Sequence, residues 1–156
     1  LFFFGEKAPV LNRYVNFGWE YVWHCHILSH EEMDMMHSMA FAVAPNAPTD
    51  LQATFDNVDT VTLTWADNSL NETGFVIERM DTSVIPNAWE ELSTVADNFD
   101  NYADVGVTPG VLYKYRVLAR NTVGDTFVYA APSIGYPHIN ADSAYTNEVE
   151  ITPTIL

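Results

Sequence analysis

The sequence predicts an all-β protein whose larger part is an antiparallel sandwich. Short runs rich in β-branched residues alternate apolar and polar positions with a period of two, as half-buried strands do. Clusters of turn residues such as "DNSLNETG" and "VIPNA" separate these runs. Helical periodicity does not extend beyond a few residues after His30. Several short strands at this spacing are typical of two packed sheets.

Five runs are the clearest candidate strands. In chain order they are residues 60–66 (TVTLTWA), 74–80 (GFVIERM), 89–95 (WEELSTV), 111–120 (VLYKYRVLAR) and 147–152 (NEVEIT). Leu63 and Trp65 share one face of the first run, and Tyr113 and Tyr115 share one face of the fourth. We expect these faces to form the core. The inward face of the second run is less clear, because Arg79 alternates in phase with apolar residues.

A stretch with two prolines, "AVAPNAPTDL", divides the chain into residues 1–44 and residues 45–156. The first part holds the only Cys, four of the five His and four of the five Met, whereas the second part holds the candidate strands. Forty-four residues are too few to bury a core of their own. We therefore expect them to form extended or hairpin structure with poor order and few contacts to the second part, and to complete a domain whose remainder lies elsewhere.

The second part resembles a fibronectin type III domain over about residues 45–153. "APNAPTDLQAT" resembles the proline-rich entry, "NETGFVIER" resembles the third strand, and Trp65 in "VTLTWADNS" occupies the position of the core Trp. "VTPGVLYKYRVLARNTVG" is similar to the family pattern L-x-P-x-T-x-Y, with Val107 in place of Leu. The resemblance implies a seven-stranded sandwich in which Tyr113 bonds to the backbone at a tyrosine corner.

One segment departs from this family pattern. Residues 125–149 are longer than the usual hairpin between the last two strands, and they are consistent with an extended loop carrying Tyr129, Tyr136 and His138 at its tip. Carbohydrate binding by this loop is an alternative to a purely structural role.

The stretch "VWHCHILSHEEMDMM" concentrates the soft and borderline metal ligands of the chain. In an extended strand, His24 and His26 point to one face and Cys25 points to the other. A turn can return His30 and Met35 to the side of the thiol. A thiolate, an imidazole and a weak thioether form most of a blue-copper ligand set, which needs one more His.

This stretch resembles the C-terminal copper signature of the multicopper oxidases. "HCHILSHEEMDM" matches the family pattern H-C-H-x-x-x-H-x-x-x-x-M at every fixed position. The resemblance implies that Cys25, His30 and Met35 bind a type 1 copper. It also implies that His24 and His26 bind the type 3 coppers of a trinuclear cluster.

The same resemblance implies a parent protein that is extracellular or periplasmic, and that oxidises a reducing small molecule or metal ion while reducing O2 to water. Copper is the implied cofactor, and upstream cupredoxin domains are the implied partners. The other H-x-H motifs of the family do not occur in this sequence, so we expect the chain alone to be inactive. Asp34 stands where the common bacterial form has Gly, which matters if that position needs a positive φ. A short helical turn is expected near Glu31–Met36.

The sequence lacks the ligands of two other kinds of metal site. A structural zinc site lacks a second Cys, and "HEEMD" lacks the second His of a zinc protease. Two alternatives stay open: a non-enzymatic fibronectin type III spacer carrying an inert oxidase remnant, and a small copper carrier. The net charge of −15 argues against binding to nucleic acid or to an anionic membrane surface. One Cys permits no internal disulfide.

Overall fold

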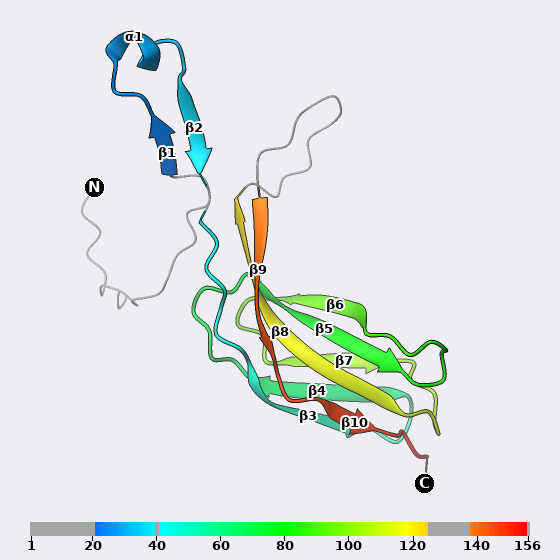
Figure 1. The fold of residues 1–156 in the computed structure, drawn as a ribbon. Coiled ribbons are helices and arrows are strands. Elements are labelled where there is room, and N and C mark those ends of the chain that lie inside the picture. Colours follow the sequence, from blue (N-terminus) through cyan, green and yellow to red (C-terminus); the bar gives the residue numbers. More distant parts are fainter. Residues whose placement is uncertain (1–20, 40, 125–137, 156) are drawn as a thin grey trace, which may run out of the picture.

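The computed structural model describes residues 21–39, 41–124 and 138–155, which form a β-hairpin followed by a two-sheet sandwich (Figure 1). The hairpin consists of β1 (Tyr21–His24), α1 (Leu28–Glu31) and β2 (Met36–Met39). All strand pairs within the described ranges are antiparallel. The predicted all-β antiparallel class is therefore confirmed.

The sandwich is built from eight strands in the described ranges. They are β3 (Thr49–Phe55), β4 (Thr60–Ala66), β5 (Gly74–Asp81), β6 (Glu90–Ala96), β7 (Asn101–Val105), β8 (Tyr113–Gly124), β9 (His138–Tyr145) and β10 (Val149–Ile151). One sheet has the order β3-β4-β7, and the other has the order β10-β8-β5-β6, with β9 also paired to β8. Seven strands were expected. The extra one arises because the last strand is interrupted near Thr146, whose hydroxyl accepts a 3.0 Å bond from Val117 N–H.

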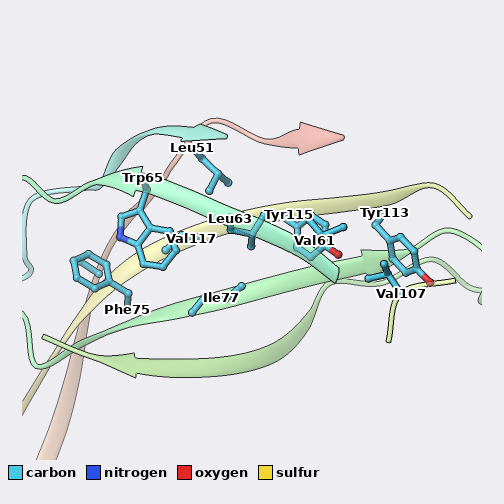
Figure 2. Close-up of a cluster of buried hydrophobic side chains, with 11 residues drawn as sticks. Leu51, Val61, Leu63, Trp65, Phe75, Ile77, Val107, Tyr113, Tyr115 and Val117 are labelled. Atoms are coloured by element: carbon cyan, nitrogen blue, oxygen red, sulfur yellow. The ribbon is translucent and has the colours of Figure 1, made fainter. Parts of the chain in front are cut away.

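The core lies between the two sheets and contains side chains from both (Figure 2). Trp65 of β4 packs against Phe75 of β5, with tilted rings whose centroids are 5.6 Å apart. Tyr113 and Tyr115 of β8 are buried, so the inward faces predicted for β4 and β8 are confirmed. The Tyr113 hydroxyl accepts a 3.1 Å bond from Thr108 N–H, which is the expected tyrosine corner.

A buried carboxylate links the two sheets. The side chain of Asp104 on β7 is 4% exposed, and it accepts bonds of 2.9 and 3.1 Å from the Arg79 guanidinium on β5. It also accepts a 2.7 Å bond from the Tyr115 hydroxyl on β8. Burial raises the pKa of Tyr115, so the phenol keeps the proton that it donates. This network explains why Arg79 alternates in phase with the apolar residues of β5.

The outer face of the five-stranded sheet holds a second cation. The guanidinium carbon of Arg116 lies 3.8 Å from the centroid of the Tyr145 ring and 4.2 Å from that of Trp89. Its nitrogens form an ion pair with Glu78, which also accepts a 2.9 Å bond from the Tyr145 hydroxyl. These contacts fasten β9 and the start of β6 to the face of β5 and β8.

An amide side chain ties the interrupted last strand to the opposite sheet. Asn147 Oδ1 accepts a 3.0 Å bond from Leu51 N–H, and Asn147 Nδ2 donates a 3.1 Å bond to Leu51 C=O. The side chain thereby pairs with the backbone of β3 as a neighbouring strand would.

The connector between hairpin and sandwich, residues 43–48, is fixed to the sandwich. The Val43 carbonyl accepts two 3.0 Å bonds, one from Asn71 Nδ2 on the β4–β5 loop and one from Asn121 Nδ2 on β8. Pro45 and Pro48 are buried. The connector is therefore part of the sandwich body rather than a loose linker.

Some sequence expectations lie outside the described residues. They include Tyr129 and Tyr136 of the proposed loop, and with them the question of carbohydrate binding. Part of the predicted loop is strand instead, because β9 begins at His138. The strands β7 and β9 were not among the candidate strands.

Arg79→Ala tests the link between the sheets. The change leaves the Asp104 carboxylate buried without its cation, so we expect the free energy of unfolding to fall by about 3 kcal/mol in a urea titration. Arg120→Ala is the matched control, because its ion pair with Asp142 lies at the surface and its loss costs within about 1 kcal/mol. Equal losses for the two variants would contradict this account.

Candidate metal centre

The residues proposed as metal ligands lie at the closed end of the β1–β2 hairpin. In this ladder Trp23 lies opposite His37, and His24 lies opposite Met36. A further bond of 3.4 Å from Cys25 N–H to Met35 C=O continues the pairing by one residue. The hairpin therefore holds the backbones of Cys25 and Met35 side by side, although ten positions separate them in sequence.

The loop between the strands is one helical turn closed by a reversal. Within it, His30 N–H donates a 2.8 Å bond to Ile27 C=O, and Met35 N–H donates a 3.0 Å bond to His30 C=O. The helix α1 ends at Glu31, earlier than the turn expected near residues 31–36. Asp34 explains the early end, since its φ of 56° lies in the left-handed region and cannot continue a right-handed helix. The position occupied by Gly in the common bacterial form thus does require a positive φ.

The first pair of candidate ligands is Cys25 and His30. Both side chains are half-buried, and Cys25 Sγ lies 3.6 Å from His30 Nδ1. A tetrahedral first-row ion bound at about 2.3 Å to sulfur and about 2.0 Å to nitrogen holds the two donor atoms about 3.5 Å apart. The pair therefore fits a shared ion with little movement. The same separation also suits a hydrogen bond between thiol and imidazole in the metal-free chain.

The second pair is His24 and His26. Their ring centroids are 4.7 Å apart, so both imidazoles lie on the same side of the chain, with Cys25 between them in sequence. His24 Nδ1 is buried and has no hydrogen-bond partner among the described residues. Leaving such a nitrogen unsatisfied costs about 1–3 kcal/mol. A metal ion, or a polar group from outside the described residues, would satisfy it.

The described residues do not complete either ligand set. No three His, Cys, Asp or Glu side chains in residues 21–39, 41–124 and 138–155 converge on one metal position. The Met35 side chain is half exposed, and only its backbone is held next to Cys25. The assignment of Cys25, His30 and Met35 to one copper, and of His24 and His26 to others, stays a prediction.

The hairpin also exposes much apolar surface. Its exposed large apolar residues are Val22, Trp23, Ile27, Leu28, Met33, Met35, Met36 and Met39. Exposed apolar side chains in this number are typical of a segment that packs against a partner. No helix in the described part of the chain is long and apolar enough to cross a membrane.

The sandwich and the ligand stretch are similar to different known proteins. No family model matches the chain. A laccase of Bacillus stratosphericus is 51% identical over 35 residues, which are 22% of this chain and 7% of the laccase. The neural cell adhesion molecule L1 of Takifugu rubripes is 31% identical over 111 residues, which are 69% of this chain and 9% of that protein. The chain thus spans less than a tenth of either relative.

The sandwich is similar in fold to solved structures of other proteins. The crystal structure of the FN1–FN3 domains of chicken CNTN1 superposes with a TM-score of 0.50 at 14% identity, covering 72% of this chain and 33% of that one. At this identity the likeness shows the fold alone. The sandwich is a fibronectin type III-like module, as the tyrosine corner and the buried Trp65 also indicate.

Asp34→Gly tests the strain at the end of the ligand loop. Because Gly adopts a positive φ without steric cost, we expect the loop to be stabilised by up to about 1 kcal/mol. The measurement is slower amide hydrogen exchange at Met35, whose N–H donates to His30 C=O. Glu32→Gly is the control: φ there is −63°, so Gly only adds backbone freedom and exchange at Met35 should become faster. Slower exchange in both variants would contradict the argument.

Proposed function

We propose that this chain is the C-terminal part of a secreted multicopper oxidase, in which the hairpin contributes copper ligands and the sandwich is an appended fibronectin type III-like module. The observation that carries the proposal is the pairing of donors on one short hairpin. Cys25 lies with His30, and His24 lies with His26, within a stretch that matches the copper signature at every fixed position. The likeness to a laccase over 35 residues supports it.

The chain's own residues would orient the metals. Copper, when bound, supplies one-electron oxidation of the substrate and reduction of O2 to water. Cys25 is covalently adjacent to both His24 and His26, so the backbone itself joins the ligands of the two proposed centres. Asp34 reverses the chain and returns the backbone of Met35 to the level of Cys25, so that Met35 would join Cys25 and His30 in holding a type 1 copper.

The remaining ligands and the substrate pocket would come from cupredoxin domains upstream of residue 1. The substrate is a reducing small molecule or metal ion, and the location is extracellular or periplasmic. An adhesion molecule among the relatives is consistent with that location. The apolar surface of the hairpin supports the existence of such a domain, because it would become buried on completion of the fold.

We expect the 156-residue chain alone to bind copper without an intense thiolate-to-copper(II) absorption band. For the type 1 site it offers the Cys25 thiolate, the His30 imidazole and the half-exposed Met35 thioether, and a blue site needs a second imidazole. Titration with copper, followed by absorption spectroscopy, checks this. A stable intense band from the purified chain, lost in Cys25→Ser, would show that the hairpin is a complete site.

The full polypeptide encoded by the gene tests the oxidase itself. We expect it to show the intense thiolate-to-copper band and substrate-dependent O2 consumption. Cys25→Ser should remove the band and most of the activity, because no other Cys is present in this chain to replace the thiolate. His37→Ala is the control, since His37 is an exposed His of β2 outside the signature, and both readouts should persist. A gene with no further H-x-H motifs before Leu1 would overturn the proposal.

A second function is favoured by one observation, namely that among the described residues the buried core belongs to the sandwich and includes no residue of the hairpin. All members of the buried cluster lie between Leu51 and Ala119. The chain could then act as a non-enzymatic spacer or binding module that carries an inert oxidase remnant. The same experiment separates the two: a full polypeptide that binds no copper and consumes no O2 supports the spacer.

A further inference from the structure

The end of the sandwich next to the connector exposes apolar side chains on two loops. We infer that this end, formed by the β4–β5 and β6–β7 loops with the connector, is a docking surface for the β-domain that the hairpin completes. The inference rests on the proposed function, because that domain is part of it. The new element is that the sandwich packs against that domain and does not move independently of it.

The first argument is the length of the tether. The Val43 carbonyl is fixed to the sandwich by Asn71 and Asn121, and β2 ends at Met39. Only three residues, 40–42, therefore lie between the end of β2 and Val43. Fully extended, the four steps from residue 39 to residue 43 span at most about 14 Å. A domain that contains β2 cannot move far from this end of the sandwich.

The second argument is the surface exposed there. Leu70 is 60% exposed on the β4–β5 loop, and Phe99 is 50% exposed on the β6–β7 loop. The two loops touch, since Asn98 N–H donates a 3.4 Å bond to Glu72 Oε1. Val43 of the connector, also exposed, is joined to the β4–β5 loop by Asn71. Leu70, Phe99 and Val43 therefore belong to three segments that hydrogen bonds hold together at the connector end of the sandwich.

The third argument is that hydrogen bonds fix these three segments in place. Backbone and side-chain bonds hold the connector and both loops, so the surface is formed before a partner arrives. Asp97 and Asp100 flank Phe99 in the sequence and give the apolar patch a polar border, as in protein interfaces. A preformed patch beside a three-residue tether favours packing of the two domains over independent motion.

The test compares Leu70→Asp with Val84→Asp. Val84 is similarly exposed, at 53%, but it lies on the β5–β6 loop at the opposite end of the sandwich. In the 156-residue chain both variants should unfold at the same temperature as the parent chain, because neither side chain is in the core. This establishes that the substitutions do not damage the sandwich.

The decisive measurement is amide hydrogen exchange in the full polypeptide. We expect residues 67–71 and 97–100 to exchange more slowly there than in the 156-residue chain. Leu70→Asp should remove this protection, and Val84→Asp should retain it. Equal exchange in the two polypeptides, or equal effects of the two variants, overturns the inference. If Leu70→Asp does not fold, Phe99→Ser on the neighbouring loop serves the same comparison.

The thiolate-to-copper band separates this inference from the proposed function. A polypeptide that shows the band but no protection of the two loops keeps the oxidase and overturns the docking surface. A polypeptide that shows loop protection without the band supports the docking surface and overturns the copper site.

Discussion

The carboxylate of Asp104 is the interaction on which the closure of the two sheets depends. A buried negative charge is costly unless it is paired and hydrogen-bonded, and Asp104 receives both from the opposite sheet through Arg79 and Tyr115. This requirement fixes the inward direction of Arg79 and keeps the Tyr115 phenol as a donor. Because domains of this size are stable by only about 5–15 kcal/mol, one such network is a large share of the total.

The parts of the fold that follow from alternation were predictable, and the parts that depend on polar pairs were not. Trp65, Tyr113 and Tyr115 fell on the faces that a period of two assigns to the core. By contrast, β7 contains an inward Asp, which reads as a turn or surface residue until its partners on distant strands are known. The sequence places residues 125–149 in a loop, and it does not show that Asn147 bonds to the backbone of β3, so neither β9 nor the interruption before β10 was predicted.

In the candidate site, too, some features were predictable from local sequence and others were not. The placement of His24 beside His26, and of Cys25 on the side of His30, follows from strand geometry and a turn. The positive φ of Asp34 was predictable, because the common bacterial form of the copper signature has Gly at this position. Asn71 and Asn121 could not have been found this way. They hold Val43 across separations of 28 and 78 residues, and a single Asn in a polar loop carries no signal of such a role.

The amide of Asn147 affects whether copies of this module associate through their sheet edges at high local concentration. A strand at the border of a sheet presents free backbone N–H and C=O groups that recruit strands from other molecules, which is the first step toward fibres. At Leu51 the side chain of Asn147 already occupies both groups. Beside it Asp50, at a φ of 57°, and the shift in register between Thr49 and Gln52 bend the strand away from a flat template. The β3 edge therefore offers no continuous ladder to a strand from a neighbouring molecule, and this hinders fusion of sheets along that edge.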